Sequence, residues 1–410
     1  MIIGVPTETA ADETRVALIP PVAEELLEAG HEIFVAAGAG AGADWADEEY
    51  EAVGCEILGD RDAIFERADV ILQVCGLGAN PDARTDPYSD GQIVIGQLGP
   101  YESDDATLAA LADRDVSAFA LELMPRISRA QSMDVLSSQA SLGGYQACLL
   151  AAEELPKMFP MEMTAAGTIK PAEVLVIGAG VAGLKAIATA ERLGANTKGH
   201  DVRLEVKQEV ESLGAEFVEL NLPTEDSGDE EGYAVEMDEA FYEEQRRQMQ
   251  RVVPESDVLI TTAAIPGRPA PEIVTTEMIE EMDPGSVVVD LAAETGGNCE
   301  PTVAGETVKV DGVTVHGPTN LPAEITHTSS QQYANNLANF IENLTEDGEL
   351  AIDLEDEIID STLLIHDGTI RNPHIEDKTA DDESDDDTGD DEIPDGAADE
   401  RTVDAEDDDD

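Results

Sequence analysis

Short hydrophobic runs alternate with amphipathic segments along the first third of the chain. The runs IIGVP (2–6), EIFVAAG (32–38) and ADVILQVCG (68–76) are separated by helix-like segments, some of which end in glycine. This alternation is typical of parallel β-strands joined by crossover helices. It predicts an α/β domain whose opening stretch ends near Pro125.

A second series with the same alternation follows. It starts at VLVIGAGVAG (174–183) and continues with the strand-like runs AEFVEL (215–220), DVLITTA (257–263) and SVVVDLA (286–292). The amphipathic segment SSQQYANNLANFIENL (329–344) is typical of a helix that crosses back to the first series.

The predicted fold is therefore two Rossmann-like, doubly wound parallel-sheet domains. Residues 1–133 together with 322–375 form the first domain, and residues 134–321 form the second. Paired α/β units usually bind ligands in a cleft between them, so we expect a cleft here.

Acidic residues dominate the charge of the chain. It has 410 residues, with 91 Asp and Glu against 22 Lys and Arg, a net charge of -69 and an ordinary hydrophobic fraction of 42%. Such a surface repels nucleic acids and anionic lipids, so neither is an expected partner. Concentrated salt relieves the self-repulsion, because the Debye length falls to about 3 Å at 1 M. The composition favours a halophile's cytoplasm over an acidic, dilute compartment.

Two segments are too polar to be expected as ordered elements. Residues 376–410 are almost entirely acidic and are predicted to be a disordered tail, whereas residues 221–245 are predicted to be a mobile loop. The four cysteines lack metal-ligand spacing, which indicates a reducing compartment. No signal peptide and no run of the ~20 apolar residues that a membrane helix needs is found, so we expect no direct membrane insertion.

The strongest local motif is the glycine-rich turn after the strand 174–177. Gly178, Gly180 and Gly183 precede a helix-like segment, and Asp201 follows about 20 residues later, as in dinucleotide-binding turns. The carboxylate of Asp201 can accept hydrogen bonds from the adenosine ribose and would repel a 2′-phosphate. NAD(H) is therefore favoured over NADP(H), although Arg203 and Lys198 can soften this preference; the alternative is a glycine turn that binds no nucleotide.

Three further segments carry candidate chemistry. TTAAIPGRPAP (261–271) and DLAAETGGN (290–298) follow strands, where small residues either line a flat ring pocket or form a rigid turn. PRISRAQSMDVLSSQA (125–140) gathers neutral hydrogen-bonding groups, either for a ligand or as a helix-capping turn. The histidines show no catalytic or metal-binding arrangement, so surface or core roles are expected for them.

Together these segments resemble one known family from Met1 to about residue 375. ETRVALIP (13–20), the 125–140 segment, the glycine turn and the 261–298 segments resemble the NAD(H)-binding alpha subunit of proton-translocating NAD(P) transhydrogenase. The resemblance implies hydride transfer between NADH and NADP⁺ held by a different subunit, which requires positioning rather than proton transfer. It also implies a homodimer and membrane-spanning, NADP(H)-binding partner subunits, which place the chain in the cytoplasm at the inner face of the membrane. A haloarchaeal source fits the acidic composition.

The resemblance also assigns roles to individual residues. For the nicotinamide and hydride transfer these are Arg126, Gln131, Asp134, Ser137 and Tyr233. For NAD(H) binding they are Gly178, Gly180, Val181, Gly183, Asp201, Val202, Met237, Ala264, Ile265 and Asn298.

Alanine dehydrogenase is the alternative enzyme, because it shares the fold and the glycine turn. Its chemistry needs a lysine and a histidine where this chain has Cys75 and Gln97, and neither can replace them as cation or general acid. Arg15 can still bind an anion or hold the domain together. A non-catalytic NAD(H)-binding module is the third interpretation.

Overall fold

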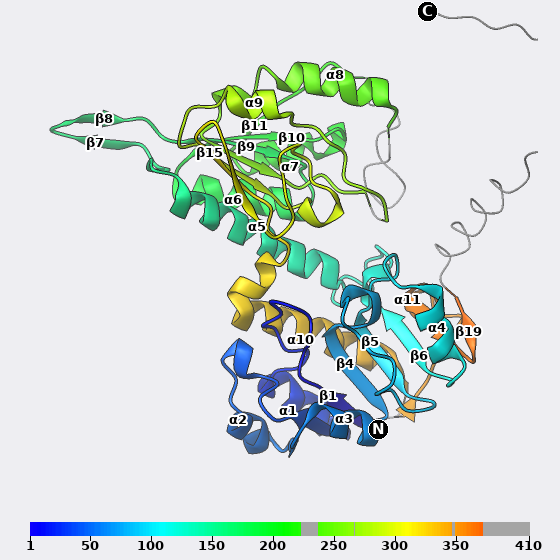
Figure 1. Cartoon of the computed structure of the whole chain (residues 1–410). Coiled ribbons are helices and arrows are strands. Elements are labelled where there is room, and N and C mark those ends of the chain that lie inside the picture. Colours follow the sequence, from blue (N-terminus) through cyan, green and yellow to red (C-terminus); the bar gives the residue numbers. More distant parts are fainter. Residues whose placement is uncertain (223–236, 266, 347–348, 372–410) are drawn as a thin grey trace, which may run out of the picture. The chain divides into compact units, whose positions relative to one another are not determined.

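The computed structural model describes residues 1–222, 237–265, 267–346 and 349–371 (Figure 1). Over these residues the chain forms two α/β domains built on mixed, largely parallel sheets, which confirms the predicted fold class. The acidic tail and Tyr233 lie outside the described residues. The predicted domain boundaries stay a prediction.

The first sheet has the strand order β19-β18-β6-β5-β4-β1-β2-β3. Its parallel strands are β1 (Ile2–Val5), β2 (Glu32–Ala36), β3 (Glu56–Leu58), β4 (Val70–Cys75), β5 (Ile93–Gln97) and β6 (Ser117–Ala120). The hairpin of β18 (Leu363–His366) and β19 (Thr369–Ile370) adds antiparallel strands beside β6. The end of the described chain therefore returns to the first sheet.

Helices join the strands of this sheet. They are α1 (Pro20–Glu28), α2 (Asp47–Val53), α3 (Arg61–Arg67), α4 (Asp105–Ala112), α10 (Thr326–Asn343) and α11 (Glu357–Thr362). A small hairpin of β16 (Thr345–Glu346) and β17 (Glu349–Leu350) follows α10.

The second sheet has the strand order β11-β10-β9-β12-β13-β15-β14. The strands are β9 (Glu173–Ile177), β10 (Asn196–His200), β11 (Glu216–Phe217), β12 (Val258–Thr261), β13 (Val287–Asp290), β15 (Val313–His316) and the antiparallel β14 (Thr307–Val310). Its helices are α5 (Val135–Glu154), α6 (Val181–Leu193), α7 (Lys207–Ser212), α8 (Glu239–Met249) and α9 (Thr276–Glu280). The hairpin of β7 (Glu162–Thr164) and β8 (Gly167–Ile169) projects between α5 and β9 (Figure 1).

Short 3-10 helices fill several connections. They are η1 (Ala41–Ala43), η2 (Leu77–Ala79), η3 (Leu121–Leu123), η4 (Leu204–Val206), η5 (Val253–Glu255), η6 (Ala293–Thr295) and η7 (Leu321–Ile325).

Part of the predicted mobile loop is helical, which corrects the sequence-based expectation for residues 239–245. Asp238 caps α8 by accepting a hydrogen bond from the backbone N–H of Phe241 at 2.8 Å. Phe241, Gln245 and Met249 are buried at a spacing of four, so this helix keeps one inward face despite its polar composition.

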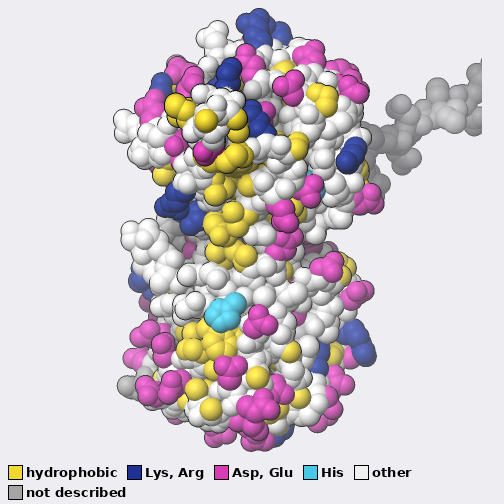
Figure 2. Space-filling model, turned by 90° about the vertical axis from the view of Figure 1, so that its left-hand side faces the viewer, with side chains coloured by type: hydrophobic (Ala, Val, Ile, Leu, Met, Phe, Trp, Pro, Cys, Tyr) yellow, Lys and Arg dark blue, Asp and Glu magenta, His cyan; other side chains and the backbone are white. Residues whose placement is uncertain are grey.

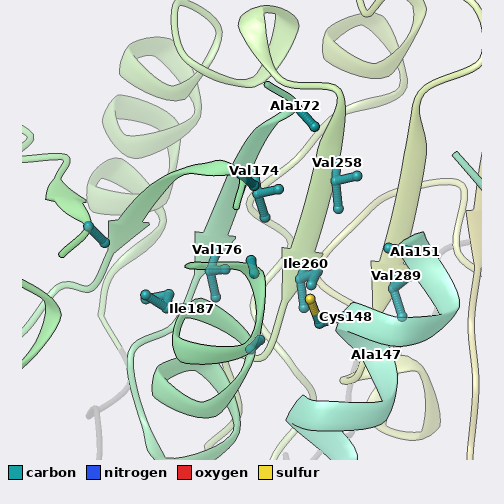
Figure 3. Packing of buried hydrophobic residues seen from close by; sticks show 14 of the residues in the cluster. Ala147, Cys148, Ala151, Ala172, Val174, Val176, Ile187, Val258, Ile260 and Val289 are labelled. Atoms are coloured by element: carbon teal, nitrogen blue, oxygen red, sulfur yellow. The ribbon is translucent and has the colours of Figure 1, made fainter. Parts of the chain in front are cut away.

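The core of the second sheet lies between its strands and helices α5 and α6. Ala147, Cys148 and Ala151 of α5 face Ile260 and Val289 of the sheet, and all are fully buried (Figure 3). Burial raises the pKa of the Cys148 thiol to about 12, so this cysteine packs as a small apolar residue.

Helix α5 approaches α6 so closely that only glycine fits at one contact. A Cβ atom on Gly144 would lie 2.0 Å from the carbonyl oxygen of Ala182, whereas a Cβ on the adjacent Gly143 would meet only Pro322 at 3.9 Å. The backbones therefore touch at Gly144, and α6 is held at a fixed position over the sheet.

Substituting these adjacent glycines should give opposite effects on stability. Gly144→Ala should lower the free energy of unfolding by about 1–3 kcal/mol, because the methyl group forces the helices apart. Gly143→Ala should leave it unchanged or raise it by up to about 1 kcal/mol through helix propensity. Chemical denaturation in concentrated salt measures both, and equal effects would contradict the close contact.

Candidate functional site

The strand order of the second sheet reverses between β9 and β12. The last residues of these strands, Ile177 and Thr261, are paired in register. Open α/β sheets bind ligands outside the carboxyl ends of the strands at such a reversal. The segments predicted to bind a nucleotide, 178–183, 201–203 and 261–271, all begin at this edge.

The glycine turn joins β9 to α6 with almost no space to spare. Gly178 has a φ of +94°, and a Cβ on Gly183 would lie 1.8 Å from the carbonyl oxygen of Gly178. Gly180 is the N-cap of α6, and a Cβ there would meet no atom of the described residues within 4 Å. The helix N-terminus therefore has open space in front of it, where backbone N–H groups and the helix dipole favour an anion.

Asp201 lies at the end of β10 and is buried beside this turn. It accepts hydrogen bonds from the backbone N–H of Ala179 at 2.7 Å and from the guanidinium of Arg203 at 2.9 and 2.8 Å. Burial alone would raise the pKa of Asp201, but the hydrogen bonds and charge of Arg203 outweigh it and hold this pKa below its usual value. The carboxylate is therefore ionised. Val202, the next residue, is half-buried.

The segment after β12 is held in place by Asn298. The side chain of Asn298 is fully buried; its Oδ1 accepts from the N–H of Ala263 at 2.9 Å, and its Nδ2 donates to the carbonyls of Ala263 and Pro271 at 2.8 and 2.9 Å. These contacts make Asn298 a support for the turn that carries Ala264, which is exposed, and Ile265, which is half-buried. A direct nucleotide contact of Asn298 stays a prediction.

A buried carboxylate fixes Asn298 in turn. Asp290, at the end of β13, accepts hydrogen bonds from the backbone N–H groups of Asn298 and Cys299 at 2.8 and 3.0 Å. It also accepts from the hydroxyls of Thr261 and Thr302 at 2.8 and 2.7 Å. Sequence reasoning placed Asp290 at the start of a candidate turn but did not identify it as its anchor.

Asp134 is the N-cap of the long helix α5. It accepts from the backbone N–H of Ser137 at 2.8 Å and from the Ser137 hydroxyl at 2.5 Å. The capping alternative for the 125–140 segment thus holds for Asp134, although the sequence suggested Ser132 and Ser138 for that role. These two serines instead bind Asn336 of α10, through the Ser132 carbonyl and the Ser138 hydroxyl.

The rest of this segment is exposed or tied to the first domain. Arg129 pairs with Asp356 through both guanidinium nitrogens at 2.7 and 2.8 Å, which fastens the segment to the start of α11. Arg126 and Gln131 are exposed. Of the remaining candidates, Val181 is 40% exposed at the first turn of α6, and Met237 is half-buried just before α8.

The structure thus brings the predicted residues together in separate groups. The glycine turn contacts Asp201 directly through Ala179, and Ala264 and Ile265 follow the neighbouring strand β12. Asp134 and Ser137 contact each other at the start of α5.

Family models match both domains of the chain. Residues 4–143 match the N-terminal domain of alanine dehydrogenase/PNT, and residues 147–373 match its C-terminal domain. The chain belongs to the alanine dehydrogenase/PNT family.

Within this family, the similarity to proteins named transhydrogenase is higher. An NAD(P) transhydrogenase subunit alpha polypeptide of Rhodospirillum rubrum is 42% identical, over 91% of this chain and 98% of the relative. The crystal structure of a transhydrogenase from Sinorhizobium meliloti has a TM-score of 0.80 and 42% identity, over 90% of this chain and all of that chain. Alanine dehydrogenase of Methanococcus maripaludis is 29% identical, over 82% of this chain and 85% of the relative.

The first domain of this alanine dehydrogenase/PNT chain also holds a buried polar cluster, around Arg15. The guanidinium of Arg15 donates to both carboxylate oxygens of Glu13, at 2.8 and 2.6 Å, and to Oε1 of Gln139 at 3.0 Å. The side chains of Glu13 and Arg15 are 0% and 5% exposed. Glu13 therefore occupies the position at which Arg15 would hold a carboxylate from outside, a residue that sequence reasoning missed although it precedes Arg15 by two positions.

Acidic groups surround this pair at the carboxyl ends of β1 and β4. Burial raises the pKa of Glu8 to about 7, although Glu8 accepts hydrogen bonds from the N–H groups of Val74 and Cys75. Burial likewise raises the pKa of the Cys75 thiol, which donates to Glu13 at 3.5 Å. Cys75 is therefore a neutral thiol and not an ionised nucleophile.

Neutralising Glu13 should destabilise the first domain strongly. Glu13→Gln leaves the Arg15 charge buried and uncompensated, which costs about 3–5 kcal/mol. The control Glu56→Gln breaks an exposed pair with Arg67, whose side chains are 54% and 45% exposed, and should cost less than about 1 kcal/mol.

The pH dependence gives this comparison a sign. Although burial opposes it, the pairing with Arg15 lowers the pKa of Glu13, so its stabilisation is present above the ordinary carboxylate pKa and is lost as the pH falls through the lowered value. The difference between wild type and Glu13→Gln should shrink in acid. A constant difference in the free energy of unfolding would contradict the assignment.

Proposed function

We propose that this chain is the NAD(H)-binding alpha subunit of an NAD(P) transhydrogenase, which transfers hydride between NADH and NADP⁺ held by a partner subunit. The observation that carries the proposal is the open N-terminus of α6 at Gly180 with the ionised Asp201 beside it. The 42% identity to a transhydrogenase alpha subunit over 91% of the chain supports the choice of reaction.

NAD(H) fits the described residues along this edge. Gly178 and Gly183 shape the turn, and the N–H groups at Gly180 and Val181 face the space that a pyrophosphate would take. Asp201 would accept from the adenosine ribose, with Val202 beside the adenine. Because the Asp201 carboxylate repels a 2′-phosphate, NAD(H) is preferred over NADP(H).

At the nicotinamide end, the chain's role is to orient the ring. Ala264 and Ile265, held by Asn298, would form one wall, and the 125–140 segment would supply Arg126, Gln131, Asp134 and Ser137. Tyr233 and Met237 are proposed to cover the site. Bound NADH supplies the hydride, so these residues need to hold the reacting carbon in place and exclude water, and none has to transfer a proton.

Alanine dehydrogenation is the second candidate, and the first domain disfavours it. Arg15 is already bound by Glu13 on both oxygens, so it lacks a vacant face for the carboxylate of alanine. Cys75 and Gln97 stand where that reaction needs a cation and a proton donor. A module that only binds NAD(H) is the third candidate.

The assay that separates these functions mixes the chain with an NADP(H)-binding transhydrogenase subunit in concentrated salt. The wild type should reduce an NADP⁺ analogue with NADH and should not reduce NAD⁺ with alanine. Gly180→Ala should fold, because its Cβ has space, yet bind NADH at least about tenfold more weakly, or 1.4 kcal/mol. Gly143→Ala is the matched control with wild-type activity.

Each outcome of this assay decides one candidate. NADH binding without transfer to the partner subunit supports the binding module, and alanine-dependent reduction supports the dehydrogenase. Unchanged NADH affinity in Gly180→Ala would contradict the proposed position of the pyrophosphate.

We further propose that the subunit is a homodimer that works in concentrated salt beside membrane-spanning partner subunits. The net charge of -69 supports the salt requirement. Among the described residues, no helix is both long and apolar enough to cross a membrane.

The β7–β8 hairpin supports the dimer. Met161, Met163 and Ile169 of this hairpin and its base are 59%, 73% and 43% exposed. Figure 2, which views the side that carries the hairpin, shows hydrophobic side chains gathered down the middle of that face. A pocket of about 400 Å³, lined among others by Leu155, Phe159 and Leu193, lies at the hairpin base and offers a second copy's hairpin an apolar seat.

A charge on the hairpin should weaken the dimer. Met163→Asp should raise the dimer dissociation constant at least about tenfold, since it places a carboxylate in an apolar contact. Leu354→Asp, at an exposed leucine outside the hairpin, is the control and should leave it unchanged. Sedimentation equilibrium measures both variants, and a dimer equally stable in each would place the interface elsewhere.

A further inference from the structure

The acceptor positions of Asp201 are all occupied by donors of the described chain. Oδ1 accepts from the backbone N–H of Arg203 at 2.9 Å and from its Nε at 2.9 Å. Oδ2 accepts from the N–H of Ala179 at 2.7 Å and from Nη2 of Arg203 at 2.8 Å. A carboxylate offers about four lone-pair sites, so none is left for the hydroxyl groups of a ribose.

The donors on Asp201 are of two kinds. The N–H groups of Ala179 and Arg203 belong to the backbone and are fixed by the fold, whereas Nε and Nη2 of Arg203 sit on a side chain with several rotatable bonds. Only the guanidinium can leave without unfolding the turn. The pair is also shielded from solvent, with side chains that are 5% and 12% exposed, so salt in the medium screens it weakly.

We propose that Arg203 occupies the ribose positions of Asp201 in the nucleotide-free protein and must release them when the nucleotide binds. The inference rests on the proposed NAD(H) site and concerns its regulation from within. Nε and Nη2 each hold one acceptor position, and the two hydroxyl groups of the adenosine ribose need two such positions. Arg203 is therefore a positioning residue that competes with the nucleotide for Asp201.

This competition has a thermodynamic consequence. Contacts that exist only in the nucleotide-free state stabilise that state alone, and they lower the affinity of any ligand that must break them. Removing the guanidinium should therefore destabilise the free protein but leave the NADH-saturated protein nearly unchanged. The affinity for NADH should increase by the same factor.

The test compares Arg203→Gln with wild type in NADH binding and in thermal stability, without and with saturating NADH. We expect about tenfold tighter NADH binding, or 1.4 kcal/mol, together with a lower melting temperature only in the absence of nucleotide. ADP-ribose, which carries the adenosine ribose but no nicotinamide, should gain the same factor. Lys207→Gln, which removes a cation of the same segment from its exposed pair with Glu219, is the control and should change neither affinity.

The possible results are distinct. Equal destabilisation of the free and bound protein with unchanged affinity would make Arg203 a purely structural partner, and weaker binding would place it on the nucleotide; either result overturns the inference. If wild type and Lys207→Gln bind no NADH at all, the proposed function itself fails.

Discussion

The close approach of backbones at the start of α6 is the constraint on which the site depends. Gly183 can lie under the carbonyl of Gly178, and Gly144 under that of Ala182, only because neither carries a Cβ. The first contact lets the helix begin directly after β9, and the second holds it against α5. Together they fix the helix N-terminus at the strand reversal, with the open side of Gly180 facing away from the protein.

Buried acids around this framework are satisfied from within the chain, but in ways that differ in permanence. Asp290 binds backbone and threonine donors, so it is a fixed anchor. Glu13 and Arg15 form a bidentate pair that Gln139 and Asn320 also hold, which closes the first domain to an external carboxylate. Asp201 alone among these three is held by a long side chain at the edge proposed for the nucleotide, so its partner is the exchangeable one.

The sequence predicted the features that local patterns encode. Alternating apolar runs gave the fold class, and the spacing of Gly178, Gly180, Gly183 and Asp201 located the turn. It did not predict the partners of buried polar groups, because these depend on tertiary contacts between distant segments. Asn298 was predicted to contact the cofactor and is found supporting Ala263 and Pro271, while Glu13 and the pairing of Arg203 with Asp201 could be located only in three dimensions. The polar composition near Asp238 hid helix α8, since its buried face consists of few residues.

The central claim is that a hydride passes directly from NADH on this chain to NADP⁺ on a partner subunit. The most direct measurement uses NADH with deuterium at both C4 positions, an NADP(H)-binding transhydrogenase subunit and mass spectrometry of the products. Direct transfer between held rings predicts one deuterium in each reduced NADP⁺ analogue and none released to water. Deuterium lost to the solvent, or an analogue reduced without the label, would contradict the account.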